Sequence, residues 1–198
     1  FYYMKYDDLV FKIPKESKNY REDSHIVVGN ILSILEKRVE NGDNKIIINT
    51  NLKKGLPLEN INKIAGPMIE AWACEVFDND DKNNMYNLIN VEAQERLGMA
   101  DVILQFKKNN DILTGNIDVK ATSNDIPESG RSPNITSFSR IRTAYVKNPD
   151  FMFIILSIKH RVYSERNEKT NLMDGIMEIV DYNAYDLKFI SEDDISYN

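Results

Sequence analysis

Two apolar runs decide the fold: ADVIL at residues 100–104 and NIDVKA at residues 116–121. A short polar turn separates them, so the two runs predict the strands of a hairpin. Because side chains alternate faces along a strand, Asp118 and Lys120 are expected to point the same way. Pairing the two runs then brings Asp101 near them. Two carboxylates and an ammonium group would therefore share one pocket.

These three side chains suit phosphodiester hydrolysis with a hard metal ion. Mg²⁺ prefers oxygen ligands, so Asp101 and Asp118 are the expected ligands, with the backbone carbonyl of Val119 as a third if the strand edge is open. Lys120 would lie against the attacking water and the phosphate and stabilise the developing charge. We expect one or two Mg²⁺ ions per site, with Mn²⁺ as a substitute. The alternative is an ordinary solvated ion pair at a sheet edge.

The composition excludes several other function classes. The 198 residues, 42% of them hydrophobic, predict one domain over residues 1–198. The longest apolar run, 151–156, is far shorter than the roughly 20 residues of a membrane-spanning helix, so we expect a cytoplasmic protein. Cys74 is the only cysteine and His25 and His160 are the only histidines, which leaves no disulfide and no structural zinc site. No glycine-rich phosphate motif is present, so no nucleotide cofactor is expected.

The net charge of −6 argues against DNA binding unless basic side chains gather locally. They do so between residues 129 and 149, where no acidic residue occurs. The basic residues there are Arg131, Arg140, Arg142 and Lys147. A solvated helix face would explain the same pattern, so this segment supports DNA binding without deciding it.

Hydrophobic periodicity predicts helices and strands in mixed order, hence an α/β protein (an α+β mixed sheet) with a central mixed β-sheet flanked by helices. The expected helices cover residues 25–40 (within an N-terminal helical segment of about 20–42), 58–77 with a kink or break at Pro67, and 136 or 137 to 147. The expected strands cover 45–50, 86–91, 100–107, 112–121, 151–162 and 175–182. The catalytic core would span about 60–182, and residues 188–198 would form a loose acidic tail.

The catalytic residues and their order resemble the PD-(D/E)XK nuclease core, and more closely the HincII-like and EcoRV-like type II restriction endonucleases. GPMIE at 66–70 is similar to the HincII segment that carries a helix glutamate, which implies a catalytic role for Glu70. Asp101 stands where the first catalytic aspartate falls, and 17 residues later Asp118 and Lys120 fill the D-x-K motif. The resemblance implies a restriction-endonuclease-like core. Glu75 competes with Glu70 on the same helix, and Glu92 or Glu95 could instead supply the additional carboxylate.

SPNITS at residues 132–137 is similar to the HincII loop whose Pro-Asn-Ile meets the bases. Asn134 takes the place of the base-contacting asparagine. The expected DNA-binding residues with neutral donors and acceptors are Thr122, Ser123, Ser132, Asn134, Thr136 and Ser137, and those suited to guanine or phosphate are Arg131 and Arg140. The alternative is an ordinary Ser/Pro loop and helix cap.

The resemblance implies a bacterial type II restriction endonuclease that cuts double-stranded DNA at a short palindromic site. Two-fold symmetric sites are met by two-fold dimers, so a homodimer is expected. The family also implies a cognate DNA methyltransferase in a restriction-modification system. The alternatives are a repair or junction-resolving nuclease on the same core, and a catalytically inactive DNA-binding module.

Overall fold

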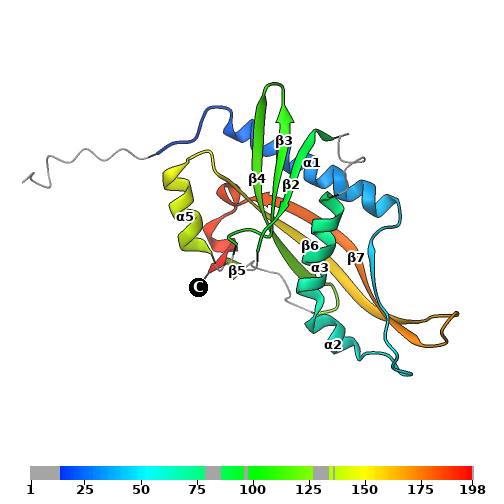
Figure 1. Ribbon diagram of the computed structural model, residues 1–198. Coiled ribbons are helices and arrows are strands. Elements are labelled where there is room, and N and C mark those ends of the chain that lie inside the picture. The colour runs from blue at the N-terminus through cyan, green and yellow to red at the C-terminus, as the bar shows by residue number, and fades with distance from the viewer. Residues whose placement is uncertain (1–13, 79–85, 96–97, 127–133, 136, 198) are drawn as a thin grey trace, which may run out of the picture.

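A six-stranded mixed sheet forms the centre of the protein, with strand order β1-β7-β6-β4-β3-β2 (Figure 1). This computed structural model describes residues 14–78, 86–95, 98–126, 134–135 and 137–197. The sheet strands are β1 (Lys45–Ile48), β2 (Leu88–Ala93), β3 (Val102–Lys108), β4 (Asp111–Ser123), β6 (Met152–Arg166) and β7 (Met173–Asp186). The described α-helices are α1 (Tyr20–Glu40), α2 (Leu58–Lys63), α3 (Ala65–Phe77) and α5 (Phe138–Lys147). The predicted mixed sheet flanked by helices is confirmed.

Most predicted elements are present with shifted ends. Helix α1 begins at Tyr20 rather than at residue 25. The expected break at Pro67 is wrong: the chain divides at Ile64, between α2 and α3. Pro67 lies in the first turn of α3, where its missing N–H removes no intrahelical hydrogen bond.

The hairpin of β3 and β4 is present, and β4 continues beyond it. The strands pair antiparallel from Lys108↔Asp111 to Val102↔Ile117, and Asn109 adopts φ 55 in the turn. Asparagine tolerates this left-handed conformation better than most residues. On its other side β4 pairs in parallel with β6. The strand that carries Asp118 therefore has an antiparallel neighbour, β3, and a parallel neighbour, β6.

The two faces of the sheet are packed differently. On β6, Ile154 and Leu156 belong to a large hydrophobic core that includes Val27 of α1 and Ile69 of α3. Their neighbours on the opposite face belong to a smaller cluster with α5 and the C-terminal segment: Ala100, Ile135, Ile141, Phe153, Ile155 and Leu187. Strand alternation produces this division.

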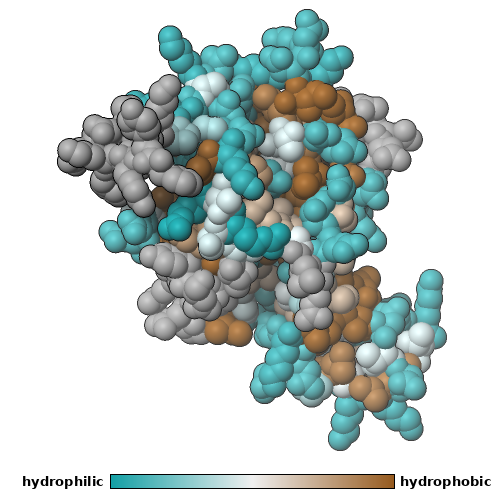
Figure 2. Space-filling view, turned by 60° about the vertical axis from the view of Figure 1, so that its left-hand side comes forward, coloured by the Kyte–Doolittle hydropathy of each residue, from teal (hydrophilic) through white to brown (hydrophobic). Residues whose placement is uncertain are grey.

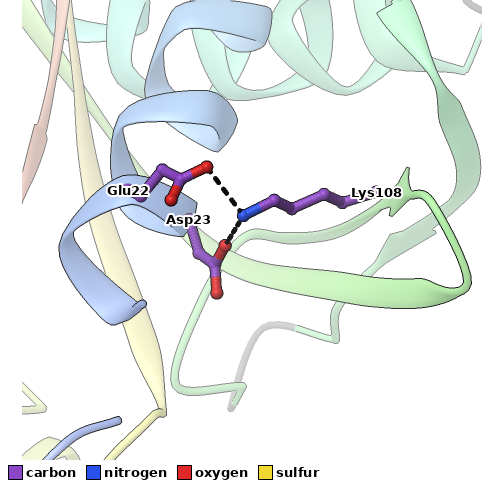
Figure 3. Close-up of polar contacts among 3 residues, drawn as sticks. All are labelled: Glu22, Asp23 and Lys108. Carbon is purple, nitrogen blue, oxygen red and sulfur yellow. Dashed lines mark hydrogen bonds and ion pairs between the residues drawn. The ribbon is translucent and has the colours of Figure 1, made fainter. Parts of the chain in front are cut away.

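The turn of the hairpin is tied to helix α1 (Figure 3). Lys108 Nζ lies 3.1 Å from Glu22 Oε1 and 2.7 Å from Asp23 Oδ1. Both acidic residues lie in the first turn of α1, where negative charge is also favoured by the helix dipole. These ion pairs connect the distal end of the hairpin to the helix that covers the large core.

The C-terminal segment contains defined structure where the sequence predicts a loose acidic tail over residues 188–198. Two 3₁₀ helices, η3 (Leu187–Phe189) and η4 (Glu192–Asp194), follow β7. Strand β8 (Ser196–Tyr197) then pairs in parallel with β5 (Asn134–Ile135). None of the described helices combines the length and the apolar character that crossing a membrane requires.

Candidate active site

Asp101 is held directly against the open part of β4. Its N–H donates to the Ile117 carbonyl at 2.8 Å, and its Oδ2 accepts from the Val119 N–H at 2.6 Å. The ladder between β3 and β4 ends at Val102↔Ile117, so the next residues of β4 have no β3 partner. The N–H and the carbonyl of one strand residue point to the same edge. The Val119 carbonyl therefore faces the same edge as Asp101.

Asp118 and Lys120 form an ion pair on one face of β4. Lys120 Nζ lies 2.8 Å from Asp118 Oδ2, and the two side chains are 29% and 16% exposed, respectively. In β6, Asp118 is paired with Ile155, and Lys120 is paired with Ser157. Ile155 belongs to the smaller hydrophobic cluster and Ser157 is polar and half-buried, so the ion pair lies at the border of that cluster.

Glu70 brings a third carboxylate from α3. Burial raises the pKa of Glu70, the charges of Asp101 and Asp118 raise it further, and Lys120 lowers it. Burial likewise raises the pKa of Asp118, with Lys120 opposing and Asp101 adding to the rise. Three carboxylates and one lysine therefore act on one another in a partly dehydrated group.

The two alternative glutamates are placed differently. Glu92 is exposed on β2, and its Oε1 accepts a hydrogen bond from Gln94 Nε2 at 3.0 Å. Glu95 is exposed in the segment after β2. Glu75 is exposed on α3, near its C-terminal end. Of these candidates, Glu70 is the one whose charge acts together with Asp101, Asp118 and Lys120.

The oxygen atoms at this edge of β4 suit a hard cation such as Mg²⁺, although the described side chains do not form a complete set of metal ligands. No three His, Cys, Asp or Glu side chains in the described part of the chain are gathered closely enough to hold a metal ion. The oxygens available at the edge are the carboxylates of Asp101 and Asp118 and the Val119 carbonyl. Mg²⁺ usually keeps several waters and takes one or two protein carboxylates, so such a partial oxygen set is suitable.

A cavity of about 280 Å³ lies beside this group, between α2, α3 and the end of β4. Its lining includes Asn62, Glu70, Lys120, Ser123 and His160. His160 is 2% exposed, its Nε2 lies 3.3 Å from Asn62 Oδ1, and burial lowers its pKa, which favours the neutral ring. In the sequence, His160 is notable only as one of two histidines, too few for a structural zinc site. The parallel register of β4 and β6 places His160 opposite Ser123 at the cavity, and no local sequence pattern specifies that register.

Two of the expected DNA-binding residues are buried at the end of β4. Thr122 and Ser123 are each 7% exposed. The Ser123 hydroxyl accepts from the Asp125 N–H at 3.2 Å, so it stabilises the turn that follows the strand. Neither hydroxyl is freely exposed in the absence of DNA, so their part in DNA binding stays a prediction.

The other expected DNA-binding residues belong to the segment leading into α5. Ser137 occupies the N-cap position of α5 without a side-chain cap hydrogen bond, and Arg140 is exposed on the helix. The backbone of Asn134 lies in β5 and pairs with Ser196. Arg131, Ser132 and Thr136 lie outside the described residues.

Comparison with known proteins identifies the family. The model of the type II restriction endonuclease HpaI family matches residues 7–198. The Type II restriction enzyme HpaI of Haemophilus parainfluenzae is 70% identical over 197 residues, which cover 98% of this chain and 78% of that protein. The expected class, a restriction endonuclease and hence a DNA-cleaving hydrolase, is confirmed. The chain belongs to the type II restriction endonuclease HpaI family.

Proposed function

We propose that this protein hydrolyses both strands of double-stranded DNA at a short palindromic site in a Mg²⁺-dependent reaction, using a PD-(D/E)XK group of the HincII-like and EcoRV-like type. One observation carries this proposal. Asp101 donates its N–H to the Ile117 carbonyl and accepts from the Val119 N–H, and these two hydrogen bonds hold its carboxylate beside the strand that presents Asp118 and Lys120. Family membership supports DNA as the substrate.

The proposed roles follow from the chemistry of each group. Asp101, Asp118 and the Val119 carbonyl would hold one or two Mg²⁺ ions, or Mn²⁺ in their place, and Glu70 would add a further carboxylate. When bound, the metal supplies charge neutralisation at the phosphate and lowers the pKa of a coordinated water. Lys120, oriented by its ion pair with Asp118, donates to a phosphate oxygen and positions the attacking water.

Recognition of the DNA sequence is assigned to the segment before and within the start of α5. The proposed contacts are Arg131, Ser132, Asn134, Thr136, Ser137 and Arg140, with Asn134 as the main reader of base edges. Thr122 and Ser123 are buried, so their proposed contribution is to hold the end of β4 beneath the DNA. A guanidinium group such as that of Arg140 contacts either phosphate or guanine.

The proposed biological setting follows from the family. A palindromic duplex has two equivalent strands, so a homodimer presents one active site to each. A cognate DNA methyltransferase would protect the same sites in the host. The enzyme would then act on incoming DNA in the bacterial cytoplasm.

Plasmid cleavage tests the proposed function. With Mg²⁺ the purified protein should produce discrete fragments whose ends map to one short sequence. Asp118→Ala and Lys120→Ala should each lower the cleavage rate by at least about 10²–10³-fold, the effect of removing one charge-stabilising group, while duplex binding in Ca²⁺ persists. Asp111→Ala, at the other end of the same strand, is the matched control and should cleave normally.

Other outcomes would contradict the proposal. Ordinary cleavage by Lys120→Ala would remove that residue from the mechanism. A requirement for branched or damaged DNA would favour the junction-resolving or repair nuclease. Wild-type protein that binds duplex DNA but never cuts it with Mg²⁺ would be a binding module.

A further inference from the structure

Strand β6 extends the face of the sheet on which Asp118 and Lys120 lie. Lys120 pairs with Ser157, and Thr122 pairs with Lys159. Cross-strand partners share a face, so Ser157 and Lys159 stand beside the catalytic strand. The apolar cover of this face includes Ile155 but neither Ser157 nor Lys159, which are half-buried.

The spacing of the two lysines matches the spacing of a DNA backbone. Neighbouring strands lie about 4.8 Å apart and two residues advance about 6.6 Å, which puts the backbones of Lys120 and Lys159 about 8 Å apart. Consecutive phosphates of one DNA strand are separated by a step of similar size. A lysine side chain is long and flexible enough to make up the difference.

Lys159 is a cation without an anionic partner among the described residues. Its neighbour Lys120 is paired with Asp118, and Arg161, two residues farther along β6, is paired with Glu178 at 2.5 Å. The β7 register partner of Lys159 is Asp181, whose Oδ1 instead accepts from the Tyr182 N–H at 2.9 Å. A half-buried ammonium group without a counter-ion gains stability when an anion binds to it.

The backbone is irregular at this point. The ladder of β6 and β7 shifts register between Lys159 and His160, whose partners are Asp181 and Ile179 and leave Val180 over. The extra residue lies on β7, so the β-bulge bends β7 beside Lys159, while the pairing of β6 with β4 stays regular. Strand alternation places Lys159 on the face of Asp118 and Lys120, and turns His160 toward α2, where it lines the cavity that Glu70 and Lys120 also line.

We propose that Lys159 binds the backbone phosphate next to the scissile one and so holds the DNA strand in register with Asp118 and Lys120. The inference rests on the proposed function. It makes Lys159 a positioning residue whose contact is independent of base sequence. The chemistry requires a phosphodiester backbone as the ligand and no particular base.

The salt dependence of duplex binding tests this assignment. Fluorescence anisotropy in Ca²⁺ would compare the intact protein with Lys159→Gln, using a duplex that contains the cleavage site and an unrelated duplex at several salt concentrations. Lys159→Gln should weaken binding to both duplexes by a similar factor. Between 50 and 200 mM salt, the wild-type affinity should fall roughly 3-fold more than that of the variant for each phosphate contact removed. Lys159→Arg should restore the wild-type slope.

Controls separate phosphate binding from folding. Lys37→Gln removes an exposed lysine from α1, which packs on the opposite face of the sheet, and should leave the slope unchanged. If Lys159→Gln has a lowered Tm, Lys159→Met is the second variant, because it removes the charge but keeps the apolar stem. It should show the same reduced salt slope as Lys159→Gln. An unchanged slope in Lys159→Met and Lys159→Gln, or a loss confined to one of the duplexes, would overturn the assignment.

The outcomes also distinguish this inference from the proposed function. If wild-type protein cleaves plasmid and Asp118→Ala does not, the proposed function stands whatever Lys159 does. An unchanged salt slope in that setting contradicts the assignment of Lys159 alone. Wild-type protein that binds neither duplex would contradict both.

Discussion

Glu70 occupies a position where its negative charge destabilises the metal-free protein. Burial raises its pKa, and Asp101 and Asp118 raise it further against the opposing effect of Lys120. A carboxyl whose pKa is higher in the folded than in the unfolded chain favours folding while it is protonated. That contribution is lost as the pH rises through the raised pKa. Such conflicts between stability and charge are typical of functional sites.

Replacing Glu70 by glutamine should therefore stabilise the protein and weaken its metal response. We expect Glu70→Gln to raise the metal-free Tm at neutral pH, and the gain should vanish at acid pH, where Glu70 is protonated. The rise in Tm caused by Ca²⁺ and the rate of Mg²⁺-dependent cleavage should both decrease. Differential scanning fluorimetry across pH, with and without Ca²⁺, measures the first two effects. Glu75→Gln, exposed on the same helix, is the control, and an equal gain there would contradict the explanation.

At the scale of elements, a buried carboxylate joins the start of α1 to the end of β7. Asp186 is 4% exposed, and its Oδ2 accepts from the Tyr20 hydroxyl at 2.6 Å and from the Ser24 hydroxyl at 2.7 Å. Its Oδ1 accepts from the Lys188 N–H at 3.0 Å. These hydrogen bonds explain why α1 begins one turn before its apolar pattern, and they fix the chain as it leaves β7.

Tyr20→Phe should destabilise the protein because it removes a buried donor to a charged acceptor. Hydrogen bonds to charged groups contribute about 1.5–3 kcal/mol, and we expect a loss of that size in the free energy of unfolding. Denaturant-induced unfolding followed by circular dichroism measures it. Tyr185→Phe is the matched control, since Tyr185 is 45% exposed on β7 and its hydroxyl has no hydrogen-bond partner among the described residues. Equal stability of the two variants would show that Asp186 does not depend on Tyr20.

The hairpin was predictable from the sequence because its determinants are local. Alternation placed Asp118 and Lys120 on one face, and the polar turn fixed the register that brings Asp101 to them. The parallel pairing of β4 with β6 was not predictable in this way. It joins Asp118 to Ile155 across a long connection, and no local pattern specifies such a register. Lys159, His160 and the buried Asp186 network depend on tertiary pairing of this kind and were therefore missed.

At the scale of the whole molecule, the surface combines a negative net charge with scattered apolar groups. The net charge is −6, so the proposed DNA binding would depend on local basic groups such as Arg140 and Lys159. Apolar side chains appear among hydrophilic ones in Figure 2. The most exposed large hydrophobic side chains described are Val146, Ile47 and Ile112, at 63%, 58% and 58%. Exposed apolar side chains that are scattered singly are normal on protein surfaces and do not by themselves mark an interface.

The proposed homodimer predicts a mass of twice the 22.9 kDa of this chain. Sedimentation velocity should give one species of that size, both alone and with a duplex containing the cleavage site in Ca²⁺. A symmetric dimer places one active site on each strand, so plasmid should be linearised without a long-lived nicked intermediate. A monomer that accumulates nicked plasmid would contradict the dimer while leaving the assigned catalytic residues in place.

Beyond Ile117, β4 has no partner in β3, and this has a consequence for pairing with other chains. An unpaired strand edge is a template for pairing with other chains, which is a common start of aggregation. In this protein the hydrogen bond from the Val119 N–H to Asp101 blocks one of the groups that a foreign strand would use, and the charges of Asp118 and Lys120 stand beside it. Asp101 thus occupies a backbone donor that a foreign strand would need, and this contact requires neither metal nor DNA.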